Sequence, residues 1–280
     1  MREAWRAAPG TCTRDPQTGE SCAWYHRARP LLRALDLVTA VGDHAPVLQA
    51  ALADGLSGGA QRVLLSGCAD ETMLAQLFDA LDRARSDADT TVLDRCATPL
   101  GLCRTFAHAE GRTPRFAMSD LFDHVPDRPY DMICTHAFLG FFAPSMRRQL
   151  IDTWARLLAP GGRLVTMQRL RPEYPEATIR FTPAQVDAFA AEARSRAAAF
   201  GDRLGIPPDD VATAASAYAL GMHTHPVRSA DELEQLFVPA GFDLTRLDTV
   251  EIARPPGVPK RGRRNTGPAV HVVVVARKSS

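Results

Sequence analysis

The sequence lacks long hydrophobic runs and has almost no net charge. Its 280 residues carry a formal net charge of +1, so no overall field draws the protein to nucleic acid or to anionic lipid. No apolar stretch approaches the roughly 20 residues of a membrane-spanning helix. The N-terminal segment 1–5 lacks the apolar core of a signal peptide. We therefore expect a cytoplasmic protein without membrane or nucleic-acid partners.

Familiar cofactor and metal motifs are also missing. The sequence holds no Gly-x-Gly-x-x-Gly, which disfavours a nicotinamide cofactor, and no Gly-x-x-x-x-Gly-Lys-Ser/Thr, which argues against a P-loop. The six cysteines form no Cys-x-x-Cys pair, and His223 and His225 alone are a weak metal pattern. We expect most cysteines to be small buried hydrophobes, with Cys12 and Cys22 the only candidate pair. No metal site is predicted.

One stretch, residues 62–71, organises the rest of the chain. An apolar run at 63–65 meets Gly67, and apolar residues at helical spacing follow at Met73, Leu74, Leu77, Phe78 and Leu81. This pattern predicts a buried strand, a tight turn and a helix whose N-terminus faces the turn. Gly67 lets the backbone approach a ligand, and Asp70 is placed to cap the helix. Such a unit opens nucleotide-binding α/β domains, but it also occurs in any α/β protein.

Strands and helices alternate after this unit. Further strands are expected at 90–93, 114–118, 130–135, 163–167, 244–252 and 270–275. Helices are expected from 98 and from about 145, and the turn at 160–162 separates the second of them from the next strand. The strand at 270–275 is apolar enough to be buried on both faces. The alternation predicts an α/β fold with a mostly parallel sheet and right-handed crossovers.

Three segments interrupt the alternation. Residues 1–20 are polar and contain Pro9 and Gly10, so we interpret them as a loop or partly ordered arm, and 21–53 as a helical cap. Two helices without an intervening strand, at 183–200 and 209–220, form an insertion over about 175–225. Capping boxes at Thr182 and Ser229 begin the helices that follow them. The basic run at 254–264 is most simply a solvated hairpin loop. We divide the chain into an arm and cap at 1–59 and a sheet domain at 60–280.

From about residue 60 to 278, the order of these signals resembles the class I S-adenosylmethionine (SAM)-dependent methyltransferases. The resemblance implies a Rossmann-like sheet of seven strands with the last one antiparallel, helices on both faces, and SAM as the cofactor. In that family an acidic residue and three spaced glycines follow the first strand. This chain has Leu65 in place of the acidic residue, keeps Gly67, and has Ala69 and Glu71 in place of the other glycines. The loop is therefore degenerate, and Asp70 or Glu71 offers a carboxylate to the cofactor's ammonium group.

The resemblance also assigns cofactor contacts to the ends of the strands. Asp94 would accept hydrogen bonds from the ribose hydroxyls, the alternative being a simple strand-end turn. Arg95 or Cys96 would then lie near the adenine plane, and Ser119 or Asp120 would bind the adenine amino group unless they only cap a helix. The full set expected to hold the cofactor is Gly67, Cys68, Ala69, Asp70, Asp94, Arg95, Ser119, Asp120 and Thr135.

Candidate catalytic residues come from two places. His136 follows the fourth strand, where the sulfonium should lie, and imidazole titrates near neutral pH, so it is the best base candidate; the alternative is a histidine bonded to a backbone carbonyl. Tyr25 and His26, beside Trp24, would place aromatic faces near the sulfonium, or would only anchor the cap. Arg169, Arg171 and Tyr174 would meet an anionic substrate.

Three functions stay open at this point. The first is a methyltransferase that acts on a small molecule under a lid made by the cap and the insertion. The second spends SAM differently, by aminocarboxypropyl transfer or by cyclisation to azetidine-2-carboxylate and methylthioadenosine. The third is a non-catalytic protein with the same fold. The sequence does not indicate the oligomeric state.

Overall fold

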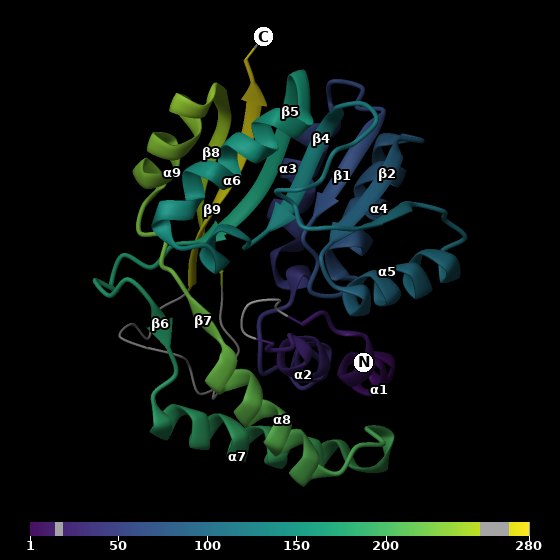
Figure 1. The fold of residues 1–280 in the computed structure, drawn as a ribbon, viewed down its shortest axis with the longest axis vertical. Coiled ribbons are helices and arrows are strands. Elements are labelled where there is room, and N and C mark those ends of the chain that lie inside the picture. The colour runs from purple at the N-terminus through teal and green to yellow at the C-terminus, as the bar shows by residue number, and fades with distance from the viewer. Residues whose placement is uncertain (15–18, 253–268, 280) are drawn as a thin grey trace.

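The computed structural model describes residues 1–14, 19–252 and 269–279, and within these ranges a seven-stranded sheet forms the centre of the molecule (Figure 1). Its strands follow the order β3-β2-β1-β4-β5-β9-β8. They are β1 (Arg62–Ser66), β2 (Asp89–Asp94), β3 (Arg115–Met118), β4 (Tyr130–His136), β5 (Leu158–Arg169), β8 (Phe242–Ile252) and β9 (Ala269–Lys278). The predicted loop at 254–264 lies outside the described residues.

The direction of each strand confirms the predicted topology. Parallel pairing joins β1 to β2 and β4, β2 to β3, and β4 to β5. The strand β9 runs antiparallel to both β5 and β8. Its residues Val272–Val275 are all buried, as the apolar run predicts for a strand covered on both faces. The sheet is therefore mostly parallel with one inserted antiparallel strand.

Helices cover both faces of the sheet, and each face has its own core. One core contains side chains of α3 (Ala45–Leu56), α4 (Thr72–Ala84) and α5 (Ala97–Ala109), and the other contains side chains of α6 (Pro144–Leu157) and α9 (Ala230–Phe237). The fully buried Trp154 of α6 donates its indole N–H to Ser66 Oγ at 3.4 Å, below the end of β1. The predicted Rossmann-like α/β architecture is confirmed.

A third core lies away from the sheet. It joins α2 (Ala23–Ala34) to α7 (Pro183–Phe200) and α8 (Pro208–Gly221), and α1 (Arg2–Thr11) packs beside α2. Figure 1 shows these four helices as a group below the sheet. Trp24 fits against α8 so closely that a Cβ at Gly221 would lie 2.7 Å from its ring. The cap and the insertion thus form one helical layer, although they are far apart in the sequence.

The N-terminal arm corrects one prediction. Residues 2–11 form the helix α1 rather than a loop, and Ala4 and Ala8 are completely buried on its inner face. Pro9 and Gly10 fall in the last turn of this helix, so little of it follows the backbone hydrogen bond that Pro9 cannot donate. Arg27 stacks over the Trp5 ring with 3.8 Å to the centroid, which helps to hold α1 on α2. Tertiary packing here outweighs the local breaker signals.

Other boundaries differ in smaller ways. The predicted cap is split between two parts of the molecule. Its helix α2 joins the helical layer, whereas α3 packs on the sheet after the 3-10 helix Val41–His44. The division of the chain at residue 59 stays a prediction. The expected turn at 160–162 lies inside the long strand β5. A short ribbon of β6 (Ile179–Arg180) and β7 (His223–Thr224), which the sequence did not indicate, joins the two ends of the insertion.

The predicted capping boxes differ in completeness. At α7, Thr182 accepts a bond from the Gln185 backbone N–H, and Gln185 returns one from its side chain to the Thr182 N–H. At α9, Ser229 accepts from the Glu232 N–H, but the Glu232 side chain does not return the bond. Within the described residues, no helix is both long and apolar enough to cross a membrane.

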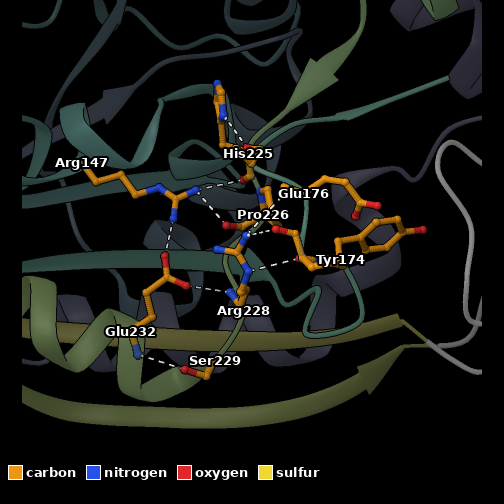
Figure 2. A network of polar contacts seen from close by, with 10 residues as sticks. Arg147, Tyr174, Glu176, His225, Pro226, Arg228, Ser229 and Glu232 are labelled. Carbon is orange, nitrogen blue, oxygen red and sulfur yellow. Dashed lines mark hydrogen bonds and ion pairs between the residues drawn. The ribbon is translucent and has the colours of Figure 1, made fainter.

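A buried arginine network fastens the insertion to the sheet domain (Figure 2). The Arg147 side chain of α6 is only 1% exposed and donates to the carbonyls of His225 and Pro226 at 3.0 and 3.1 Å and to the Glu232 carboxylate. The other Glu232 oxygen accepts the Arg228 backbone N–H at 2.8 Å. The Arg228 guanidinium then donates to the carbonyl of Tyr174 at 3.1 Å. Both connections of the insertion therefore meet at one charged cluster.

Replacing Arg147 with alanine should destabilise the fold by about 3 kcal/mol, because it leaves a partly buried carboxylate and two carbonyls without their donor. Urea unfolding would measure the change. The matched control is Arg148→Ala on the exposed side of the same helix, which should change the free energy of unfolding by less than about 0.5 kcal/mol. Equal effects of the two substitutions would contradict the role given to Arg147.

Candidate functional site

A cavity of about 720 Å³ lies between the carboxyl ends of the parallel strands and the helical layer. The loops after β1, β2, β3 and β4 line its sheet side, and α2, α8 and the segment after β7 line the opposite side. The predicted site residues found in its wall are Tyr25, His26, Gly67, Cys68, Ala69, Asp70, Asp94, Arg95, Ser119, Asp120 and His136. Thr135 is the exception, since its completely buried side chain points into the protein instead of lining the cavity.

The loop after β1 keeps the sharp turn expected of it. Gly67 has φ +72°, a conformation that favours glycine, and its N–H donates to the Leu93 carbonyl at 2.9 Å. A Cβ at this position would lie 2.5 Å from the Phe138 ring. The close approach that glycine permits here is therefore made by Phe138, on the loop after β4, and both residues face the cavity.

Asp94 connects the loops that follow β1 and β2. One carboxylate oxygen accepts the Cys68 N–H at 2.9 Å, and the other accepts the Cys96 N–H at 2.8 Å. Burial raises the pKa of Asp94, whereas nearby His26 and the two backbone donors lower it. Each carboxylate oxygen keeps a further lone pair, so the side chain can still accept bonds from a vicinal diol. The strand-end turn and the ligand-binding role, set as alternatives by the sequence, are compatible in this geometry.

The two acidic residues of the degenerate loop have a partner in α2. Arg33 donates to Glu71 at 2.7 Å and lies 3.3 Å from Asp70. Asp70 also accepts the Thr72 N–H at 3.0 Å, but it lies one residue before Glu71, which is the N-cap of α4 in place of the predicted Asp70. Burial raises the pKa of Asp70, but Arg33 and Arg29 lower it further, so the net shift is downward. Its second oxygen has no hydrogen-bond partner among the described residues, which fits a carboxylate that receives an ammonium group.

The loop after β3 has a more local role. The Asp120 carboxylate accepts the Phe122 N–H at 3.0 Å, and the Ser119 hydroxyl donates to the Asp120 carbonyl at 3.0 Å. These bonds shape a turn that brings both residues to the cavity wall. Arg95 is exposed, and its carbonyl accepts the Thr13 hydroxyl at 2.8 Å. The assignment of this loop to adenine stays a prediction.

Three histidines meet at the opposite end of the cavity. His136 Nε2 and His44 Nδ1 are 2.8 Å apart, so one ring donates and the other accepts, and His271 lies against His44 with 4.6 Å between ring centroids. Burial is the main cause that lowers the pKa of all three, and neighbouring positive charge adds to it. The pKa of His271 falls to about 3. His136 is therefore a neutral imidazole that is hydrogen-bonded to the ring of His44.

Sequence reasoning missed His44 and His271, because a single histidine in a helical cap or in a late strand carries no local signal. It also missed Tyr218 and Arg29, which belong to an aromatic wall around Tyr25. Tyr25 stacks on Tyr218 with ring centroids 5.8 Å apart and meets Phe141 edge to face at 6.1 Å. Burial raises the pKa of Tyr25, so its hydroxyl stays protonated. Arg29 borders the same wall and donates to the Thr39 carbonyl at 3.1 Å.

His26 has a different setting from the one predicted. Its ring lies edge to face with Tyr25, but its Nδ1 points to Cys12 Sγ at a distance of 3.5 Å. Burial lowers its pKa, yet hydrogen bonds to Cys22 and Cys96 outweigh that effect and raise the pKa to about 9. The structure thus places His26 in a cysteine cluster at the edge of the cavity, next to Asp94.

Comparison with known proteins matches part of the chain to a family model. Residues 64–166, which span β1 to β5 and include Gly67, Asp94, Ser119 and His136, match the family model described as a methyltransferase domain. The strand order and the loops that line the cavity agree with that match. Residues 64–166 are thus similar to a methyltransferase domain, and the chain has the fold of the class I SAM-dependent methyltransferases. It is therefore a SAM-dependent transferase, although no curated protein sequence matches it closely.

Solved structures share this fold at low sequence identity. The N-methyltransferase NodS from Bradyrhizobium japonicum WM9, in complex with S-adenosyl-L-homocysteine, is 16% identical with a TM-score of 0.51, over 90% of this chain and 98% of that one. A SAM-dependent methyltransferase from Clostridium acetobutylicum ATCC 824 is 9% identical with a TM-score of 0.54, and the match covers 91% of this chain and 97% of that one. The SAM-dependent methyltransferase SibL in its apo form is 21% identical with a TM-score of 0.51, and the match covers 99% of this chain and 65% of that one.

The buried histidines of this methyltransferase predict acid sensitivity. Their pKa values are lowered by folding, so the unfolded chain binds more protons below about pH 6.5, and stability falls as the pH drops through that range. Unfolding free energies measured from pH 7.5 to pH 5 should show the fall. His271→Gln should make it shallower, whereas His108→Gln on the exposed face of α5 should not; an unchanged slope in His271→Gln would refute the assignment.

The geometry of Asp94 predicts its part in cofactor binding. Asp94→Asn should weaken the affinity for S-adenosylhomocysteine by about 1–3 kcal/mol, because the amide accepts fewer bonds and carries no charge. Titration calorimetry would measure it, with circular dichroism to check the fold. Asp89→Asn, at the other end of the same strand, is the control and should leave the affinity unchanged. Wild-type affinity in the Asp94 variant would rule out its contact with the cofactor.

Proposed function

We propose that this enzyme transfers the methyl group of SAM to a small molecule enclosed between the sheet and the helical layer. The observation that carries the proposal is the cavity of about 720 Å³, whose wall includes both Asp94 and the histidine pair. Its volume lies within the range of small-molecule sites. We further propose a cytoplasmic enzyme whose partners include neither nucleic acid nor membrane.

The residues around the cavity fit the cofactor at three points. Asp94 would hold the ribose hydroxyls, Asp70 keeps an unpartnered oxygen for an ammonium group, and Tyr25 offers a ring face to positive charge. Bound SAM supplies an electrophilic methyl carbon on a sulfonium. The remaining catalytic work for the protein is to orient a nucleophile and, where it carries a proton, to accept that proton.

His136 is the group suited to that proton. Its burial keeps the ring neutral at neutral pH, and the 2.8 Å contact with His44 orients it. A lowered pKa makes the imidazole a weaker base, which suits a nucleophile that loses its proton as the new bond forms. We infer that His136 is the base and that His44 positions it.

The opposite wall indicates the kind of substrate. Tyr25, Tyr218 and Phe141 present aromatic faces, and Arg29 places a guanidinium beside them. A flat organic molecule with an acidic group would match this combination of ring faces and positive charge. Phe189 of α7 stacks in turn on Tyr218 with ring centroids 6.2 Å apart. The helical layer therefore supports this aromatic wall on the side away from Tyr25.

A second function is favoured by the degenerate loop. Asp70 and Glu71 form ion pairs with Arg33, and the Phe138 ring fills the space beside Gly67. The part of the cavity next to this loop therefore differs from one lined by a loop with three glycines. Reaction at the γ-carbon of SAM, by aminocarboxypropyl transfer or by cyclisation, would suit such a rebuilt site. The spent nucleoside separates the alternatives, since methyl transfer leaves S-adenosylhomocysteine and γ-carbon chemistry leaves methylthioadenosine.

The test is incubation with SAM, first alone and then with a library of small aromatic acids, followed by mass spectrometry of the nucleoside product. We expect S-adenosylhomocysteine that appears only when an acceptor is present. Methylthioadenosine formed from SAM alone would overturn methyl transfer in favour of cyclisation. His136→Ala should lower turnover by roughly 10²–10⁴-fold with SAM affinity retained, while His108→Ala should change neither. Unchanged turnover in His136→Ala would remove it as the base.

A further inference from the structure

Four side chains with metal-binding atoms converge where the N-terminal helices meet the sheet. They are Cys12, Cys22, His26 and Cys96, and their ligand atoms all lie within 4.8 Å of one another. We propose that this cluster is a structural metal site that binds one zinc ion through three thiolates and one imidazole. The proposal departs from the sequence-based expectation of no metal, and it does not depend on the reaction that the enzyme catalyses.

Two of the distances between the ligand atoms are those of a tetrahedral ion, and all four atoms lie within 4.8 Å of one another. Cys12 Sγ and His26 Nδ1 are 3.5 Å apart, and Cys22 Sγ and Cys96 Sγ are 3.6 Å apart. Zinc lies about 2.3 Å from sulfur and about 2.0 Å from nitrogen, so two neighbouring ligands of a tetrahedral site lie about 3.5–3.8 Å apart. Three cysteines and one histidine are also a ligand set that zinc uses in structural sites. Zinc binding would displace the protons on the thiols and the proton on the ligating nitrogen of His26.

A disulfide is a poorer account of the same cluster. All six cysteines are free in the described structure, and 3.6 Å between Cys22 and Cys96 is well beyond the roughly 2.05 Å of an S–S bond. A disulfide between Cys22 and Cys96 would also not explain why Cys12 and His26 point to the same place. One metal ion satisfies all four side chains.

The cluster joins three helix ends. Cys12 follows the last residue of α1, Cys22 precedes α2, and Cys96 precedes α5, directly after the Asp94 strand end. Surrounding polar groups already orient two of the ligands: Thr98 Oγ1 lies 3.1 Å from Cys12 Sγ, and the Cys96 N–H donates to Asp94 at 2.8 Å. Such outer contacts are typical of metal sites. The metal would therefore fasten the N-terminal helices beside the cofactor loop.

All four positions of a tetrahedral ion are filled by protein side chains in this arrangement. A closed site of this kind stabilises the fold and leaves no open position for water or substrate. His26 would then act as a metal ligand and not as the aromatic catalytic residue near the sulfonium that the sequence predicted. The expected consequence of metal removal is a loosened N-terminal arm, with a lower melting temperature in the full-length protein.

Elemental analysis of the protein purified with reductant and without added metal tests the site. We expect about one zinc ion per chain, and a roughly tenfold or greater loss in both Cys22→Ser and Cys96→Ser. Cys134→Ser, a buried cysteine of β4 outside the cluster, is the matched control and should keep its zinc. Cobalt(II) taken up by the chelator-stripped wild-type chain should show thiolate charge-transfer bands and the visible absorption of a tetrahedral ion.

The wild-type measurements decide the matter even if the serine variants fail to fold. A chain that is purified without metal, takes up neither zinc nor cobalt(II), and shows cluster cysteines that react freely with an alkylating agent would overturn the proposal. Peptide mapping that finds a Cys22–Cys96 disulfide in protein purified without reductant would overturn it as well. Zinc bound equally well by the wild type and both serine variants would place the ion elsewhere and contradict the assignment.

Discussion

The site depends on one half-buried carboxylate that holds two loops in place. Asp94 accepts the Cys68 N–H from the turn after β1 and the Cys96 N–H at the start of α5. These loops come from neighbouring parallel strands, so their ends meet at the same edge of the sheet. Without an acceptor between them, two backbone donors would be left unpaired in a partly buried place, which is costly. The same carboxylate that builds the pocket is also the group that we propose binds a sugar diol.

The helical layer supplies the rest of the cavity. Because α2, α7 and α8 share a core of their own, the layer is a second body that faces the sheet and not a set of loose loops. The Arg147 cluster fixes its connections at one end, and Arg33 reaches from α2 to the cofactor loop. The proposed zinc site would add a third attachment at the N-terminal helices. A lid held at several points can position aromatic side chains precisely over a small substrate.

Much of the fold could be predicted from local patterns. Short apolar runs located the strands of the central sheet, and Gly67, Asp94 and the late strand at 270–275 pointed to the family before the structure did. The helix α1 was missed because its stability comes from contacts with α2, which outweigh the local signals of Pro9 and Gly10. Propensity describes a segment alone, whereas burial depends on distant partners.

The site was less predictable for the same reason. His136 was visible because it follows a strand, but His44 and His271 join it from a cap segment and from the last strand. Thr135 was placed correctly on β4 but on the wrong side of it. The cysteine cluster brings together residues whose spacing resembles no metal motif.

The most direct test of the central claim is a crystal structure with S-adenosylhomocysteine. The account predicts both ribose hydroxyls within hydrogen-bond distance of the Asp94 carboxylate, and a nucleoside bound elsewhere, or excluded by the side chains of this pocket, would contradict it.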